Sequence, residues 1–295
     1  MNAPPGAGRL QTHDGLQPPG SAQARGAPAL PADSVAATAE PFYLAAGDEV
    51  AIFEQCHAQR LPVMLKGPTG CGKTRFIEYM AWRLRLPLIT IACHDDLSAS
   101  DLVGRFLVRH DGTAWQDGPL TRAVREGAIC YLDEVVEARQ DTVVVLHPLT
   151  DHRRLLPLDK TGELLDAAPG FQLVVSYNPG YQRMLKDLKP STRQRFVALD
   201  FEFPSAEREI AILERETGVD HGNAQALVGM GRRLRALQDK GLAEAPGTRL
   251  LVAAARLIAS GIAPQLACSA ALVSPLSDDD SLRGAMQDLV AATFA

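Results

Sequence analysis

The feature that most constrains this chain is a phosphate-binding loop that stands between a strand and a helix. Its residues, Gly67-Pro68-Thr69-Gly70-Cys71-Gly72-Lys73-Thr74, match the pattern G-x-x-x-x-G-K-[ST] completely. The apolar run Leu61–Leu65 before the loop predicts a buried strand, and Thr74–Trp82 after it predicts an amphipathic helix. Glycines let successive N–H groups and the helix N-terminus converge on phosphate oxygens. The motif therefore predicts a nucleoside triphosphate site, in which Lys73 meets the β and γ phosphates and Thr74 holds Mg²⁺.

A second acidic motif follows along the chain. The apolar run Ala128–Leu132 ends in Asp133-Glu134 and is typical of a strand buried on both faces of a parallel sheet. Acids at the carboxyl end of such a strand lie where ligands bind in open α/β sheets. We expect Asp133 to hold Mg²⁺ through water and Glu134 to polarise the attacking water. The adjacent Glu favours an ATPase over a nucleotide sensor.

The order of the segments predicts an α/β architecture. Strand and helix patterns alternate, which favours a parallel sheet with helices on both faces. Candidate strands cover residues 62–66, 88–92, 128–132, 171–177 and 195–201. From about Ser205 the pattern becomes helical and predicts a small all-α lid, closed by a helix over residues 280–292. The predicted domains are a disordered tail rich in Ala, Pro and Gly (1–40), the ATPase domain (41–204) and the lid (205–295).

Two β-hairpins are predicted as insertions in the sheet domain. Residues 106–115 contain an Asp111-Gly112 turn between apolar residues, and residues 155–165 carry Thr161-Gly162 at their tip. Each hairpin is either surface decoration or a lever that moves with the ATPase cycle.

Other polar residues are candidates for the same site. Asn178 ends the fourth strand, where it either positions the lytic water or belongs to an Asn-Pro turn. Arg193 and Arg195 precede the fifth strand and could reach a neighbouring subunit as arginine fingers. Arg249 opens a lid helix and could approach the nucleotide from above.

Composition limits the class of protein. The net charge of −5 and the pI near 5.8 do not indicate the basic surface that nucleic-acid binding requires. No apolar run is long enough to span a membrane and no signal peptide begins the chain, so we expect a soluble, cytoplasmic protein.

The five cysteines lack metal-site spacing and are interpreted as small buried hydrophobes, except that Cys71 could be oxidisable. The stretch Arg232, Arg233 and Arg235 is interpreted as the solvated face of a helix.

Taken together, these motifs resemble an AAA+ ATPase of the MoxR branch, and more narrowly the CbbQ/NirQ/NorQ family. The resemblance covers nearly all of residues 41–295. The segments that carry it are 61–74, 93–104, 115–120, 130–139, 176–180 and 189–196.

The resemblance implies a homo-hexameric ring with ATP and Mg²⁺ bound between subunits. Lys73 and Thr74 match the Walker A positions, and Asp133 and Glu134 match Walker B. By the same resemblance, Asn178 matches the sensor 1 position and Arg249 matches the sensor 2 position. Arg195 matches the arginine-finger position, with Arg193 as the alternative.

The resemblance also implies a function and partners. Members of this family act as remodelling chaperones with an adaptor that carries a von Willebrand A domain. The client is a metalloenzyme, with nitric oxide reductase maturation slightly favoured over Rubisco activation. The alternative is a slow nucleotide-dependent switch that does no mechanical work. A nucleic-acid motor is disfavoured by the acidic charge balance.

Overall fold

The computed structural model describes residues 1, 39–110, 112–179, 188–238, 242 and 244–294. Most of the predicted tail (residues 2–38) and the turn residue at position 111 lie outside the described residues. Within these ranges, no helix is long and apolar enough to cross a membrane.

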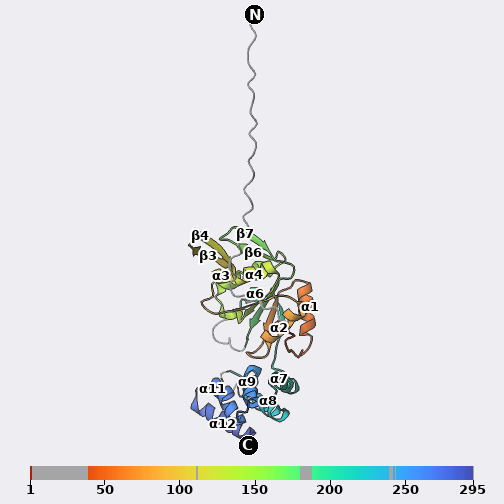
Figure 1. The fold of residues 1–295 in the computed structure, drawn as a ribbon, viewed down its shortest axis with the longest axis vertical. Coiled ribbons are helices and arrows are strands. Elements are labelled where there is room, and N and C mark those ends of the chain that lie inside the picture. Colours follow the sequence, from red (N-terminus) through yellow and green to blue (C-terminus); the bar gives the residue numbers. More distant parts are fainter. Residues whose placement is uncertain (2–38, 111, 180–187, 239–241, 243, 295) are drawn as a thin grey trace. The chain divides into compact units, whose positions relative to one another are not determined.

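A five-stranded parallel sheet organises the first part of the chain (Figure 1). In spatial order its strands are β2 (Leu88–Ala92), β5 (Ile129–Asp133), β8 (Gln172–Tyr177), β1 (Val63–Lys66) and β9 (Val197–Asp200). All five predicted strands are present, and the largest difference in their bounds is two residues, at the start of β9. Leu132 pairs with Val175 and Leu65 pairs with Ser176. This register brings the carboxyl ends of β1, β5 and β8 together at one edge of the sheet.

The sheet is buried on both faces. Along β5, Ile129 and Tyr131 belong to a core that contains Phe53 and Phe76, while Cys130 and Leu132 belong to a second core. Alternate side chains of a strand point to opposite faces, so the two cores lie on opposite sides of the sheet. The predicted α/β class, with helices on both faces, is confirmed.

Helices and two antiparallel hairpins complete this part. The α-helices are α1 (Glu49–Ala58), α2 (Lys73–Leu84), α3 (Ala99–Val103), α4 (Pro119–Glu126), α5 (Gln140–Val144) and α6 (Pro190–Arg193). Two 3-10 turns are η1 (Val135–Glu137) and η2 (His147–Leu149). The hairpins are β3–β4 (Gly104–Arg109 and Gly112–Asp117) and β6–β7 (Leu155–Leu158 and Glu163–Asp166).

The C-terminal part is helical, as predicted, and we call α7–α12 the lid. Its elements are α7 (Ala206–Thr217), α8 (His221–Arg235), α9 (Thr248–Ala259), α10 (Pro264–Cys268), the π-helix η4 (Ser269–Val273), α11 (Ser274–Leu276) and α12 (Asp280–Thr293). These helices share a core of their own that includes Leu213, Leu227 and Leu251. The domain division at residue 204 stays a proposal.

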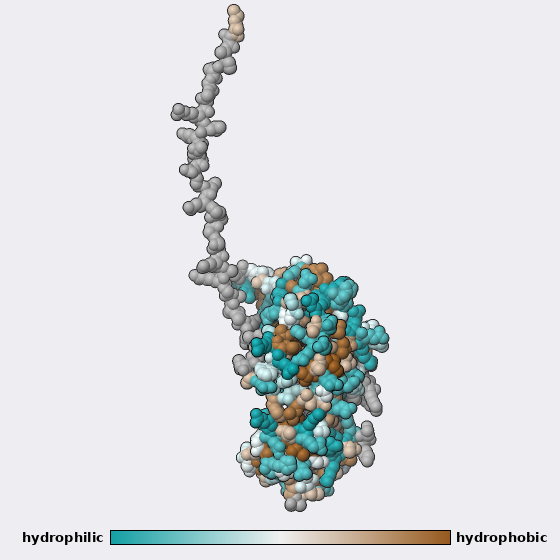
Figure 2. Space-filling model, turned by 90° about the vertical axis from the view of Figure 1, so that its right-hand side faces the viewer, coloured by the Kyte–Doolittle hydropathy of each residue, from teal (hydrophilic) through white to brown (hydrophobic). Residues whose placement is uncertain are grey.

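Hydrophobic side chains also reach the surface in places. On the face shown in Figure 2 they occur in several small groups among hydrophilic ones. The most exposed large apolar residues of the described chain beyond Met1 are Val108 on β3, Leu266 on α10 and Leu164 on β7.

Candidate functional site

The phosphate loop joins β1 to α2, and two of its glycines are required by close contacts. A Cβ at Gly67 (φ +156°) would lie 2.3 Å from the carbonyl oxygen of Phe201. A Cβ at Gly70 (φ +73°) would lie 3.0 Å from the Cα of Gly247 in the lid. Larger residues at either position would push the loop away from its neighbours. The glycines therefore allow the loop to pack between the sheet and the lid.

Lys73 is the first residue of α2 and is almost fully buried. Its Nζ donates hydrogen bonds to the carbonyl oxygens of Gly67, at 2.7 Å, and Pro68, at 2.9 Å. The first turn of α2 holds no acidic side chain, and no side-chain cap occupies its N-terminal N–H groups. A buried ammonium and a helix N-terminus together favour a bound polyanion.

Asp133 ends β5 and is held by two buried hydroxyls. Its Oδ1 accepts hydrogen bonds from Tyr131 Oη, at 2.7 Å, and from Ser176 Oγ, at 2.6 Å. Among the described residues, no hydrogen bond reaches Asp133 Oδ2. The carboxylate is therefore fixed in orientation with one oxygen left for a ligand.

Glu134 is held in an uncommon backbone conformation. It has φ +55° and ψ +52°, the left-handed region that non-glycine residues adopt at a cost of about 1 kcal/mol or more. Its backbone N–H donates to Ser176 Oγ at 2.7 Å. Burial raises the pKa of its carboxyl, an effect that Lys73 partly offsets and Asp133 reinforces. A raised pKa makes this carboxylate a better proton acceptor than an ordinary surface Glu.

The residues predicted to hold Mg²⁺ suit that ion chemically. Thr74 offers a hydroxyl near the Tyr131 hydroxyl, and Asp133 offers its second carboxylate oxygen. Hard oxygen donors of this kind, with water and phosphate oxygens completing the shell, are what Mg²⁺ prefers in proteins. Thr74 and Asp133 both line the cavity described below.

Asn178 lies just beyond β8 and is buried. Its Nδ2 donates to Thr69 Oγ1 in the phosphate loop at 3.1 Å. The side chain is therefore joined to the loop, as a residue that senses bound phosphate would be.

The two candidate finger arginines have different surroundings. Arg193 Nε donates to the carbonyl oxygen of Leu188 at 3.0 Å, and its guanidinium lies 6.0 Å from the ring centre of Tyr177. Arg195 is half-buried, and among the described residues its buried Nε has no hydrogen-bond partner. Neither arginine lines the cavity.

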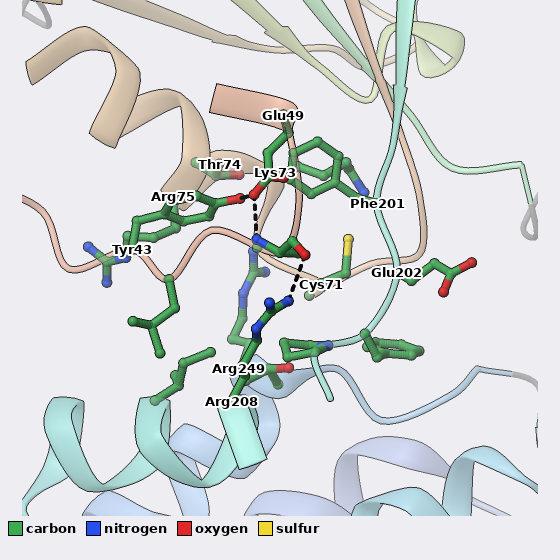
Figure 3. Close-up of a pocket in the computed structure, with 18 of the residues that line it drawn as sticks. Tyr43, Glu49, Cys71, Lys73, Thr74, Arg75, Phe201, Glu202, Arg208 and Arg249 are labelled. Atoms are coloured by element: carbon green, nitrogen blue, oxygen red, sulfur yellow. Dashed lines mark hydrogen bonds between the residues drawn. The ribbon is translucent and has the colours of Figure 1, made fainter. Parts of the chain in front are cut away.

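One large cavity, of about 1450 Å³, collects most of the predicted residues (Figure 3). Of the predicted site residues, it is lined by Thr69, Gly70, Cys71, Gly72, Lys73, Thr74, Asp133, Glu134 and Arg249. Figure 3 shows Arg249, together with Arg208 of α7, on the lid side of the cavity.

Sequence reasoning missed the other end of this cavity. Tyr43 Oη donates to Glu49 Oε1 at 2.7 Å, and the N–H groups of Ala46 and Gly47 donate to the same carboxylate. Arg208 donates to the carbonyl oxygen of Ala46 at 2.9 Å. These contacts fold the segment before α1 into a wall of the cavity. The aromatic residues Phe42 and Tyr43, at the start of the predicted ATPase domain, were the only signal for this wall in the sequence.

Two further predictions are corrected by the structure. Arg235 is not on a solvated face: its side chain is 11% exposed and pairs with the fully buried Glu209, whereas Arg232 and Arg233 are exposed. The environment of Cys71 argues against an oxidisable thiol, because the residue is 7% exposed and burial raises its pKa. The reactive form of cysteine is the thiolate, which a raised pKa disfavours. All five cysteines are buried and unpaired, as predicted for small hydrophobes.

Comparisons with known proteins agree with this geometry. Residues 62–196 match the AAA domain (dynein-related subfamily), and residues 209–293 match the CbbQ/NirQ/NorQ C-terminal family. The chain is 60% identical to protein CbbQ of Hydrogenophilus thermoluteolus, over 87% of this chain and 96% of that protein. It is 60% identical to protein NorQ of Paracoccus denitrificans, over 86% and 94% of the two chains. It is 62% identical to the denitrification regulatory protein NirQ of Pseudomonas aeruginosa, over 85% and 97%.

A solved structure supports the fold alone. A RuvB mutant of Thermotoga maritima superposes with a TM-score of 0.51 at 13% identity, over 82% of this chain and 68% of that one.

Proposed function

Since the chain belongs to the CbbQ/NirQ/NorQ family of AAA domain proteins, we propose that it is an ATPase that remodels a protein client. The observation that carries this proposal is the convergence of the phosphate loop with Asp133 and Glu134 at one cavity. A simple nucleotide-binding protein would need the loop but not a tethered acid with a raised pKa beside it.

Each residue has a role in the proposed hydrolysis. Lys73 would turn from the loop carbonyls to the β and γ phosphates, and the α2 N-terminus would bind the same oxygens. Thr74 and Asp133 would hold Mg²⁺, which when bound would neutralise phosphate charge. Glu134 would accept a proton from the attacking water. Asn178 would report the state of the γ-phosphate to the loop through Thr69.

Two variants separate binding from chemistry. Lys73→Ala removes the buried charge at the start of α2, so ATP binding should weaken and turnover should vanish. Glu134→Gln keeps the shape but removes the base, so ATP should bind and remain unhydrolysed. Normal turnover by Glu134→Gln, measured as phosphate release, would show that the base lies elsewhere.

We propose a homo-hexamer in which an arginine from one subunit completes the site of the next. Arg195 is favoured over Arg193, because the Arg195 Nε is unpartnered among the described residues whereas Arg193 is bonded within its own chain. Loss of such an arginine costs roughly 10³ to 10⁵ in rate in GTPases. Arg195→Ala should lose turnover, retain ATP affinity and regain activity when mixed with Glu134→Gln subunits. An unaffected Arg195→Ala protein, or no gain on mixing, would move the role to Arg193 or remove it.

The proposed client is a metalloenzyme, reached through an adaptor with a von Willebrand A domain. The identities to CbbQ, NorQ and NirQ are nearly equal, so they do not separate Rubisco activation from nitric oxide reductase maturation. We keep the slight preference for nitric oxide reductase. The genes that neighbour this one, followed by client activation in a reconstituted assay with the adaptor, would decide between the two.

The alternative function is a slow nucleotide switch. The geometry at Glu134 favours hydrolysis, but a switch would have the same loop and lid. Turnover measured with and without the adaptor and client distinguishes them, because a remodelling ATPase should be stimulated by its partners and a slow switch should not.

A further inference from the structure

A buried ion pair in the lid is bonded to a turn that contacts the phosphate loop. The guanidinium of Arg235 on α8 donates to both carboxylate oxygens of Glu209 on α7, at 2.6 and 2.8 Å. Glu209 is fully buried and the Arg235 side chain is 11% exposed. Such a pair is often no more stabilising than apolar residues of similar volume, because burial of both charges costs solvation energy. Stability alone therefore does not explain why charges stand here.

The pair holds one turn of the chain from two sides. Arg235 Nε donates to the carbonyl oxygen of Pro246 at 2.9 Å, and Thr248 Oγ1 donates to Glu209 Oε1 at 2.6 Å. The Arg235 guanidinium also lies 4.0 Å from the ring centre of Phe203, a residue that lines the cavity. The turn 246–248 is buried throughout. Both charged partners thus fix the same short segment between α8 and α9.

That turn packs against the phosphate loop. The backbone N–H of Thr248 donates to the carbonyl oxygen of Gly70 at 3.1 Å. A Cβ at Gly247 would lie 2.8 Å from the carbonyl oxygen of Thr69 and 2.9 Å from the Cα of Gly70. The contact therefore tolerates no side chain and little displacement. The next residue is Arg249, which lines the cavity.

We propose that Glu209 and Arg235 are positioning residues for the nucleotide: Glu209 through Thr248, and Arg235 through Pro246, fix the turn 246–248 against the phosphate loop and set the place of Arg249. The inference rests on the proposed nucleotide site and adds to it a pair of residues that do not contact the ligand. If the turn loosens, the binding-competent arrangement is populated for less of the time, and the apparent affinity falls by that fraction.

The test compares two substitutions of Thr248 in the full chain, with Mg-ADP as the probe in titration calorimetry. Thr248→Val keeps the size of the side chain but cannot donate to Glu209, whereas Thr248→Ser keeps the hydroxyl. Loss of a hydrogen bond to a charged group should raise the Kd of Thr248→Val about tenfold. Thr248→Ser should bind within about twofold of the unaltered chain. Equal affinity for Val and Ser variants, or a loss of thermal stability with no change in Kd, would overturn the proposal.

A second variant avoids leaving a lone buried charge. In Glu209→Leu with Arg235→Met both charges are replaced together, so the lid should fold with little loss of stability. Its Kd for Mg-ADP should still rise, because the turn loses its hydrogen bonds to both members of the ion pair. Arg232→Met and Arg233→Met are the matched controls, since they remove a positive charge from the exposed surface of the same helix. A folded double variant that binds like these controls would refute the positioning role.

The proposed nucleotide site has its own control in the same experiment. If the unaltered chain binds Mg-ADP no better than Lys73→Ala does, the nucleotide site itself is wrong. If the unaltered chain binds well and the Thr248 and ion-pair variants do too, only the positioning role fails.

Discussion

Ser176 offers the sharpest test of how the acidic end of the site is built. It is fully buried in β8, donates to Asp133 Oδ1 at 2.6 Å and accepts from the Glu134 N–H at 2.7 Å. Ser176→Ala removes both bonds with almost no change in volume. The substitution therefore isolates hydrogen bonding from packing.

The expected loss of stability follows from these two contacts. The bond to the Asp133 carboxylate is worth about 1.5–3 kcal/mol, and the unsatisfied Glu134 N–H costs about 1–3 kcal/mol more. Relaxation of Glu134 from the left-handed conformation returns about 1 kcal/mol. The net destabilisation should be about 1.5–5 kcal/mol, which is a fall in Tm of roughly 3–20 °C for a domain of this size.

The same substitution should separate turnover from binding. Glu134 would no longer be held in place, so kcat for ATP should fall at least about tenfold, as misplacement of a catalytic group commonly does. The Kd for ATP should change little, because Lys73 and the loop are untouched. Urea denaturation and phosphate release measure the two effects.

A matched control keeps this result interpretable. Ser260 is exposed and donates to the carbonyl oxygen of Leu257, so Ser260→Ala should cost less than about 0.5 kcal/mol. Ser176→Ala with the stability and turnover of Ser260→Ala would refute the reasoning. Tyr131→Phe removes the other bond to the same Asp133 oxygen and should have a smaller effect, since Ser176 still bonds both Asp133 and the Glu134 N–H.

Three further predictions use separate parts of the molecule. Burial raises the pKa of Glu134, so the folded chain favours the protonated carboxyl, and this contribution to stability is lost as pH rises through the folded-state pKa. In urea denaturation, Glu134→Gln should therefore be more stable than the unaltered chain near about pH 8 and equal to it below about pH 4. Arg193→Ala should lower Tm more than Arg195→Ala, because, of these two side chains, only that of Arg193 donates a hydrogen bond to the backbone among the described residues. In the β6–β7 hairpin, Lys160→Ala with Glu163→Ala should leave basal ATP hydrolysis within about threefold but impair client activation with the adaptor. Glu163→Ala alone should account for the loss of client activation. Glu163 accepts two hydrogen bonds from Arg125 on α4, and Arg125 also donates to Asp117 on β4.

The sheet and the phosphate loop could be predicted because they follow from local pattern. Buried parallel strands are continuous apolar runs, and the loop has a fixed spacing of glycines before Lys73. The hydroxyls that hold Asp133 could not be predicted in this way. Ser176 and Tyr131 sit within apolar strands and look like ordinary core positions, and their roles depend on the register of β5 with β8.

In the lid, the charge pattern of the sequence led to a wrong prediction for Arg235. Arg235 stands in a run of three arginines, which is typical of a solvated face. The buried partner of Arg235 is Glu209, which lies 26 residues earlier. In the sequence, Glu209 cannot be distinguished from the other acidic residues of its helix. Only the packing of α7 on α8 identifies which of these charges meet.

The final prediction asks whether the two hydroxyl networks act independently. Ser176 holds the acids at the end of β5, and Thr248 holds the lid turn against the loop, so the first should govern kcat and the second the Kd. One chain of contacts joins them: Asn178, two residues beyond Ser176, donates to Thr69 Oγ1, and the Thr69 carbonyl oxygen packs against Gly247. The free-energy effects of substitutions at distant sites that share no partner usually add within about 0.5 kcal/mol.

We expect the Ser176→Ala, Thr248→Val double variant to show additive effects on Kd in the presence of Mg-ADP. With ATP, in the non-hydrolysing Glu134→Gln background, the γ-phosphate should engage Asn178 and the coupling should exceed about 1 kcal/mol. Equal coupling with both nucleotides would mean that Asn178 does not transmit the state of the γ-phosphate to the lid.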